Sequence, residues 1–184
     1  MTLTKTPICN FGEKAKDFNL LSTENKKISL NEVKGENGTL IMFICNHCPY
    51  VKAVIKDIVQ DAKFLETLGI KSVAIMSNDV KKYPEDSFEN MLSFSKDHNF
   101  SFPYIIDKTQ KVAKEYDAVC TPDFFGYNKN LELQYRGRIR KLKDLKPMGH
   151  GDSDLRTAMK LVASSGKGPV KQVPSMGCNI KWFE

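Results

Sequence analysis

Residues 39–52 of the 184-residue chain read TLIMFICNHCPYVK and decide how its central part folds. The run that ends at Cys45 shows no alternation of apolar and polar side chains, so it predicts a central strand covered on both faces. Pro49 follows Cys48 directly, and proline is favoured in the first turn of a helix, where its missing N–H is not needed. The apolar spacing after Pro49 predicts a helix that ends near Gly69. The two cysteines of this CxxC motif therefore lie at the junction of a buried strand and a helix.

The predicted helix start gives Cys48 a chemical role. Free N–H groups at a helix N-terminus stabilise a thiolate, so we expect the pKa of Cys48 to fall. His47 and Lys52 are close in sequence and act in the same direction if they face the sulfur. A thiolate is the species that reacts in disulfide exchange and with peroxides. Cys45 reaches Cys48 only through a turn at Asn46, because three extended residues would separate the Cα atoms by roughly 10 Å, beyond the limit of about 7 Å for a disulfide.

The order of the remaining elements follows from hydrophobic periodicity and turn residues. It comprises a hairpin of Phe18–Leu21 and Lys27–Leu30, a strand over 70–76, a helix over 85–97, a strand over 102–106, a helix over 110–116, a hairpin of 123–127 and 131–139, and a helix over 152–164. Alternating strands and helices give a parallel sheet, and the late hairpin adds antiparallel strands. We therefore predict an α/β fold with a mixed central sheet and helices on both faces. Residues 1–184 form one domain, with an N-terminal β-hairpin extension in 1–35 and an irregular C-terminal tail over 167–184.

Composition excludes several classes of function. Hydrophobic residues make up 41% and charged residues 27%, an ordinary globular balance. No apolar run reaches the roughly 18 residues of a membrane span, the N-terminus lacks a secretory signal, and no nucleic-acid motif is present. The basic stretch Arg136–Lys146 could bind an anionic partner, but we interpret it as a solvated strand edge and loop. We expect a cytoplasmic protein with no membrane or nucleic-acid partner.

Five cysteines in such a chain argue against a structural disulfide framework and leave metal binding, redox chemistry or core packing. Cys45, His47, Cys48 and Cys120 could place soft ligands within one site. Structural zinc usually shows two clean ligand pairs, and here the second pair is missing. We therefore expect no metal and no cofactor.

A second segment, Cys120-Thr121-Pro122-Asp123, heads a predicted strand. Pro122 has no N–H for a strand ladder, so at this position it marks a special turn. Together with this segment (CTPDFF, 120–125), the chain carries CNHCPYVK (45–52), SND followed by YPEDS (77–87), FPYIID (102–107), YRGRI (135–139) and GCNIKW (177–182).

In combination these segments resemble the peroxiredoxin-like branch of the thioredoxin superfamily, whose members are often described as alkyl hydroperoxide reductase/thiol-specific antioxidant domain proteins or thioredoxin family proteins. The resemblance runs from about residue 10 to 184 and implies a thioredoxin-like fold and a redox role. It assigns Cys48 to the nucleophilic first cysteine and Pro122 to the cis proline opposite it. It implies a cis peptide between Thr121 and Pro122, packed against the Cys48 loop.

The chain also departs from the family patterns. Val51 stands where thioredoxin has its second, resolving cysteine. Neither Cys45 nor Cys48 follows the peroxidatic pattern Pro-x-x-x-Thr/Ser-x-x-Cys, and Thr121 occupies the position that corresponds to the pocket arginine. The candidates to resolve an oxidised Cys48 are therefore Cys45, Cys120 and Cys178. Cys45 ranks first because Asn46 is a good turn residue.

Three functions stay open. The first is a thiol–disulfide oxidoreductase that uses a helix-capped reactive Cys48 in the CNHC motif, with Cys45 as partner and His47, Pro49, Thr121 and Pro122 in support. The second is a peroxiredoxin-like thiol peroxidase, and the third is a non-catalytic thioredoxin-like module for redox sensing or binding. The substrates expected are thiol or disulfide proteins, small thiols or peroxides.

Overall fold

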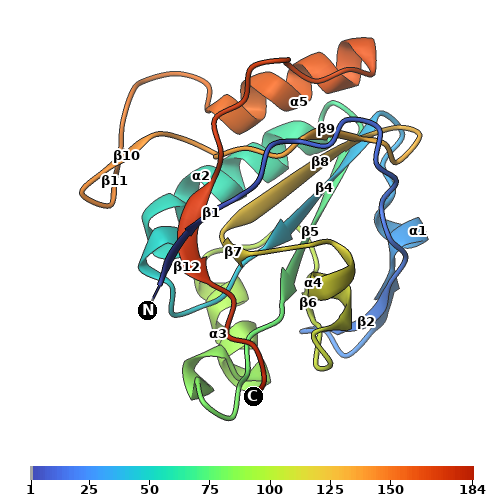
Figure 1. The fold of residues 1–184 in the computed structure, drawn as a ribbon. Helices are drawn as coiled ribbons and strands as arrows, with labels where there is room; N and C mark the ends of the chain where they lie inside the picture. The colour runs from blue at the N-terminus through green and yellow to red at the C-terminus, as the bar shows by residue number, and fades with distance from the viewer. Residues whose placement is uncertain (1) are drawn as a thin grey trace.

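The computed structural model describes residues 2–184, and its framework is a seven-stranded sheet in the order β3-β2-β6-β5-β4-β8-β9 (Figure 1). The strands are β1 Leu3–Lys5, β2 Asn19–Ser22, β3 Lys27–Ser29, β4 Gly38–Phe43, β5 Ile70–Met76, β6 Tyr104–Ile106, β7 Cys120–Thr121, β8 Asp123–Asn128, β9 Leu133–Tyr135, β10 Leu142–Lys143, β11 Lys146–Pro147 and β12 Met176–Asn179. The helices are α1 Leu30–Val33, α2 Pro49–Glu66, α3 Phe88–Asp97, α4 Lys111–Glu115 and α5 Asp154–Ser165.

The centre of the sheet is β4, which lies between β5 and β8. Every residue of β4 is buried, as the unbroken apolar run predicts. β4 pairs in parallel with β5, and β5 pairs in parallel with β6. β8 runs antiparallel to β4 and β2 runs antiparallel to β6, so the predicted mixed sheet is confirmed.

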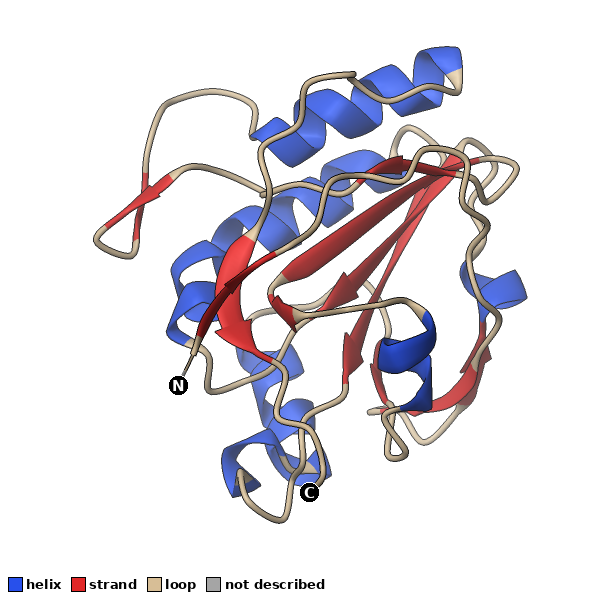
Figure 2. Ribbon diagram, in the orientation of Figure 1, coloured by secondary structure: helices blue, strands red, loops and turns tan. Residues whose placement is uncertain are grey.

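Helices cover both faces of the sheet, as predicted (Figure 2). Alternate residues of a strand point to opposite faces. Leu40 and Met42 of β4 accordingly pack in one core with residues of α2, α3 and α5. Ile41 and Phe43 pack in a second core with residues of α1 and α4.

The two predicted hairpins are present. β2 and β3 pair antiparallel, and β2 also pairs with β6, so the N-terminal hairpin extends the main sheet. β9 ends at Tyr135 rather than at Ile139, because the chain turns there and the Tyr135 hydroxyl donates to the Arg138 carbonyl.

The C-terminal tail is mostly irregular, as predicted, but it contains one strand, β12. This strand pairs with β1 and with β7 to make a small three-stranded sheet. Its register sets Cys178 opposite Thr121. Sequence periodicity could not predict β12, since a four-residue strand is defined here by partners from distant parts of the chain. The strand carries the tail to the junction of β4 and α2.

One other helix begins at a different residue from the one predicted, and one hairpin was not predicted. The helix predicted from residue 85 begins at Phe88, after a single 3₁₀ turn over Pro84–Asp86, and Ser87 caps it. A β10–β11 hairpin, which the sequence did not indicate, projects from the body of the protein near α2 (Figure 1). Within residues 2–184, none of the helices has the length and apolar character to cross a membrane.

Candidate active site

The loop between β4 and α2 carries the CxxC motif, and it is bent at Asn46 and His47 rather than extended. The buried carboxylate of Asp86 holds the bend by accepting hydrogen bonds from the backbone N–H of Asn46 at 2.8 Å and of His47 at 3.3 Å. The Tyr104 hydroxyl donates to Oδ1 of Asn46 at 2.9 Å. The turn that the sequence required for contact between the two cysteines is therefore present.

Cys48 is the N-cap residue of α2, and Pro49 occupies the first turn of that helix as predicted. Its side chain has no exposed surface. As a thiol, Cys48 donates from Sγ to the Thr121 carbonyl at 3.1 Å. A hydrogen bond from Cys45 is the largest cause that lowers the pKa of Cys48 to about 5; burial opposes it, and hydrogen bonds from Cys178 and from the backbone N–H of Val51 add to it.

Two thiols therefore flank Cys48, one from the strand that precedes it and one from the C-terminal tail. Cys45 comes from the end of β4, and its Sγ also lies 3.3 Å from Oγ1 of Thr121. Burial and the hydrogen bond to Cys48 hold the pKa of Cys45 well above its ordinary value. Burial and the contact with Cys48 likewise raise the pKa of Cys178, to about 12. One acidic sulfur thus lies between two protonated ones.

The remaining two cysteines make no hydrogen bond to Cys48 among the described residues. The Cys120 thiol points to the Pro122 carbonyl at 3.6 Å, and burial raises its pKa. Cys9 packs in the second core, and burial raises its pKa to about 11. All five cysteines are reduced in this structure. Of the three candidates to resolve Cys48, Cys45 and Cys178 hydrogen bond to it, whereas the Cys120 thiol is directed at the Pro122 carbonyl instead.

Thr121 and Pro122 form the opposite wall of the site. The peptide bond between them is cis, as the resemblance implied. The Thr121 carbonyl contacts Cys48 and its hydroxyl contacts Cys45, so this residue touches both members of the motif. The prediction that this turn packs against the Cys48 loop is confirmed.

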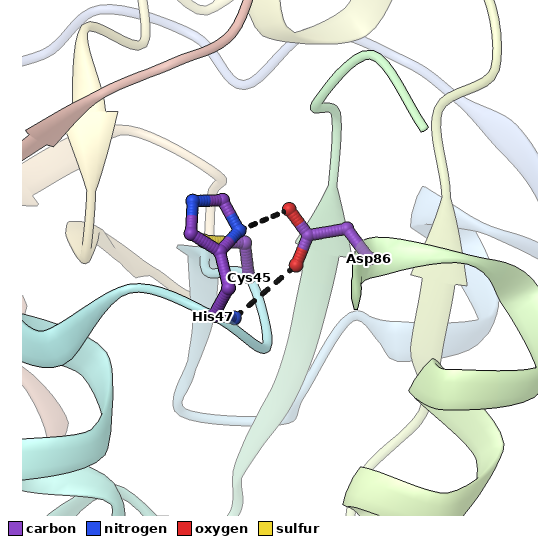
Figure 3. Close-up of side chains that lie close together, drawn as sticks. All are labelled: Cys45, His47 and Asp86. Carbon is purple, nitrogen blue, oxygen red and sulfur yellow. Dashed lines mark hydrogen bonds and ion pairs between the residues drawn. The ribbon is translucent and has the colours of Figure 1, made fainter. Parts of the chain in front are cut away.

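His47 forms a pair with Asp86 beside Cys45 (Figure 3). Nδ1 of His47 lies 2.7 Å from Oδ2 of Asp86, and Nε2 is buried without a hydrogen-bond partner among residues 2–184. The ring stacks on Tyr83 with centroids 5.4 Å apart and planes 9° apart. The hydrogen bond that the His47 ring donates to Asp86 raises the pKa of His47 above its ordinary value of 6.5, against an opposing effect of burial.

Asp86 belongs to this candidate site, and the sequence analysis missed it. It has no exposed surface and also accepts a hydrogen bond from Nδ2 of Asn78 at 2.8 Å. Burial raises its pKa, but the hydrogen bonds from His47 and Asn78 outweigh that effect and lower it. The segments SND and YPEDS, which contain these residues, were visible as motifs, yet nothing in their spacing pairs them with His47.

Cys45, His47 and Asp86 are also the residues that could hold a metal ion. One ligand atom of each lies within 4.8 Å of the others. Both oxygens of Asp86 already accept two hydrogen bonds each, from backbone N–H groups on one side and from His47 and Asn78 on the other. The carboxylate is thus committed to supporting the loop, and the donor set fits a protein hydrogen-bond network better than a cation.

Known proteins place the chain in a family. The model of the AhpC/TSA family matches residues 11–142. No curated protein matches the sequence. An uncharacterized conserved protein from Geobacillus kaustophilus has a crystal structure that is 39% identical over 100% of this chain and 97% of that chain, with a TM-score of 0.93. A hypothetical protein from Sinorhizobium meliloti 1021, SMc02350, is 36% identical over 97% of both chains, with a TM-score of 0.88.

A more distant structure shows the fold alone. Peroxidoxin BcpB from Mycobacterium tuberculosis is 14% identical over 67% of this chain and 81% of that chain, with a TM-score of 0.56. The expected thioredoxin-like fold and the peroxiredoxin-like resemblance are confirmed by these matches together. The family match spans the strands β2 to β9, both active-site segments and the Asp86 turn. The chain therefore belongs to the AhpC/TSA family, within the thioredoxin superfamily.

Proposed function

We propose that the protein is a thiol–disulfide oxidoreductase in which Cys48 is the nucleophile and Cys45 is the resolving cysteine. The observation that carries the proposal is the position of Cys48 at the start of α2, with the Cys45 thiol hydrogen bonded to it. A pKa of about 5 keeps Cys48 almost wholly as thiolate at neutral pH. A thiolate is the attacking species in disulfide exchange.

In the first step, the Cys48 thiolate attacks one sulfur of a substrate disulfide. A new S–S bond joins Cys48 to that sulfur, and the substrate S–S bond breaks with the electron pair leaving on the other sulfur. His47 has a raised pKa and Nε2 is unpartnered, so its imidazolium can give a proton to the leaving thiolate.

In the second step, Cys45 attacks the sulfur of Cys48 and releases the rest of the substrate as a thiolate. Burial keeps Cys45 protonated, so this step needs a base. The neutral His47 left by the first step takes that proton, and a ring nitrogen of His47 lies within 4.8 Å of Sγ of Cys45. The substrate gains two electrons and the protein ends with a Cys45–Cys48 disulfide, which an external dithiol reduces to complete the cycle.

Cys45 is preferred over Cys178 because of where the two lie in the chain. Cys45 and Cys48 share one short loop, so a disulfide between them requires adjustment of the bend at Asn46 and His47 alone. Cys178 lies in β12, which is paired on both sides, and a bond to Cys48 would draw that strand against α2.

Peroxide reduction is the second candidate, and the acidic Cys48 thiolate is the observation that favours it. Peroxide would transfer one oxygen to this sulfur and give a sulfenic acid, which a neighbouring thiol condenses with. The Thr121 hydroxyl, which could orient a peroxide, is hydrogen bonded to Cys45. Disulfide substrates therefore rank first.

The deciding experiment follows the fate of Cys48 in Cys→Ser variants by mass spectrometry after addition of a peptide disulfide. We expect Cys45→Ser to accumulate a mixed disulfide between Cys48 and the peptide, Cys48→Ser to form none, and the control Cys120→Ser to behave like the parent. If Cys45→Ser forms an intramolecular disulfide as fast as the parent, Cys178 is the resolving residue. If Cys48→Ser retains full activity, the proposal is wrong.

A parallel reaction with hydrogen peroxide separates the two candidates. A thiol peroxidase would consume peroxide with turnover and form a sulfenic acid at Cys48 far faster than the peptide disulfide is reduced. We expect the opposite ranking of the two rates.

A further inference from the structure

A groove of about 220 Å³ lies directly beside the cysteine site. Its wall includes Pro122, whose neighbour Thr121 contacts Cys48, and Tyr50, in the first turn of α2. Met176 of β12, close to Cys178, closes a third side. Because Cys48 has no exposed surface, a substrate must displace side chains to reach it, and the groove borders all three segments around the sulfur.

The floor of the groove is apolar and its rim is basic. Val54, Ile139 and Leu142 contribute apolar surface. Lys5, Arg138 and Arg140 are the charged residues of the lining, and no carboxylate lines it.

The two arginines already have carboxylate partners. Arg138 pairs with Asp154 and Arg140 pairs with Asp57. Lys5 is exposed and has no ion pair within the described part of the chain.

The β10–β11 hairpin begins at Leu142, which lines the groove, and it projects away from the body of the protein (Figure 1). Lys141, Lys143 and Lys146 are exposed on it, and across residues 2–184 none of them has a carboxylate within ion-pair distance. Leu145 and Met148 are each 42% exposed at the same hairpin. Asp144 at the hairpin turn is also exposed, so three lysines face one carboxylate and the hairpin keeps a net positive charge. A net positive potential attracts acidic groups, while exposed apolar side chains favour a protein partner over a nucleic acid.

We propose that the groove and the β10–β11 hairpin together bind an acidic, partly apolar segment of the partner protein whose disulfide Cys48 reduces. This inference rests on the proposed function, since it names the class of substrate for the same site. Acidic side chains of the segment lie against Lys143, Lys146 and Lys5, and its apolar side chains fill the groove beside Pro122. When the segment is bound in this way, a cysteine of the partner protein that neighbours the segment lies at the start of α2, where Cys48 is.

The test measures binding directly, without any redox step. A fluorescein-labelled, cysteine-free peptide rich in Glu and Leu is titrated with the full-length Cys48→Ser protein, and anisotropy reports binding. A matched peptide with Lys in place of every Glu is the comparison. We expect the acidic peptide to bind roughly tenfold or more tightly than the basic one, with a difference that shrinks as salt screens the charges.

The hairpin is then tested with Lys143→Glu/Lys146→Glu in the same background. Two lysines that attract the acidic peptide become two glutamates that repel it, so we expect the affinity for that peptide to fall roughly tenfold. Lys108→Glu/Lys129→Glu is the matched control, because it makes the same change of charge at exposed lysines away from the groove. Equal loss in both variants, equal binding of both peptides, or equally strong competition by single-stranded DNA would overturn the proposal.

An activity arm separates this inference from the function it rests on. With Cys48 restored, the hairpin variant should lose rate on a disulfide-linked acidic peptide and keep it on a small uncharged disulfide. If neither disulfide is reduced while the acidic peptide still binds, the proposed reaction fails and the binding surface stands. If both are reduced equally by parent and hairpin variant, the binding surface fails and the reaction stands.

Discussion

Cys48 and Cys120 are equally buried, with no exposed surface on either side chain, yet their acidities move in opposite directions. At Cys120, burial and the nearby charge of Asp123 raise the pKa. At Cys48, hydrogen bonds from Cys45, Cys178 and the backbone of α2 outweigh the same burial and lower the pKa to about 5. Exposure therefore does not distinguish the more acidic thiol here; the donors aimed at its sulfur do.

The surroundings of the two cysteines differ in a second way. Each lies near a fully buried carboxylate, Asp86 in one case and Asp123 in the other. Asp123 pairs with Arg136 at 3.0 Å, and a guanidinium keeps its charge at all ordinary pH values. Asp86 pairs with His47, which gains and loses a proton near neutral pH. Of these two buried carboxylates, Asp86 is therefore the one paired with a side chain that titrates near neutral pH.

The largest effect is expected from removing the carboxylate that supports the Cys48 region. Asp86→Asn replaces the carboxylate with an amide, so the donors of His47 and Asn78 lose their charged acceptor. We expect the free energy of unfolding to fall by about 3 kcal/mol, the lower end of the range for breaking a buried ion pair. His47 has a folded-state pKa above 6.5, so its contribution is fully present below 6.5 and is lost as pH rises through the folded-state value. Urea unfolding should therefore show a larger loss at pH 5.5 than at pH 8.5.

The control for this prediction removes the titrating partner. In a His47→Gln background, Asp86→Asn should cost the same at both pH values, because the imidazole proton that the Asp86 carboxylate stabilises has been removed. The Cys48 thiol, whose pKa is about 5, titrates in both members of this pair and so does not enter the difference. A loss of stability that does not change with pH in the parent background would show that the Asp86–His47 contact stabilises the loop without charge.

A smaller effect is expected for the rate at which cysteines are alkylated. At pH 7, Cys48 with a pKa of about 5 is nearly all thiolate, whereas Cys9 with a pKa of about 11 has a thiolate fraction of about 10⁻⁴. The less basic thiolate is intrinsically less nucleophilic, and a Brønsted coefficient of about 0.4–0.5 cancels roughly 10²·⁴ to 10³ of that advantage. Iodoacetamide labelling followed by mass spectrometry should therefore modify Cys48 roughly 10–40 times faster. Equal labelling of Cys9 or Cys120 would contradict the comparison.

The sequence predicted the main sheet and the helix at Cys48 because their signals are local. An unbroken apolar run, a proline at a helix start and a helical spacing each require only neighbouring residues, and β4 and α2 follow from them. The cis peptide before Pro122 and its place opposite Cys48 came from the family resemblance rather than from periodicity.

The parts of the site that the sequence did not predict depend on contacts between residues far apart in the chain. Asp86 reaches His47 across 39 positions of sequence, and Cys178 reaches the site only because β12 pairs with β7. Polar residues in a loop carry no periodic signal, and a four-residue strand has too few residues for one. Such tertiary contacts also decide which of three candidate cysteines lie against Cys48.

The smallest effect is expected for the acidity of Cys48 when Cys178 is replaced. The thiol of Cys178, in the C-terminal tail, hydrogen bonds to Cys48. A hydrogen bond to a charged group is worth about 1.5–3 kcal/mol, and one pKa unit corresponds to about 1.4 kcal/mol. The Cys45 thiol and the N–H of Val51 remain in Cys178→Ala, so we expect the pH midpoint for alkylation of Cys48 to rise by about one unit, the lower end of that range. Cys120→Ala is the matched control, because it removes an equally buried thiol and should leave the midpoint unchanged. If both variants shift the midpoint equally, the acidity of Cys48 reflects general packing of the site rather than the donor supplied by β12.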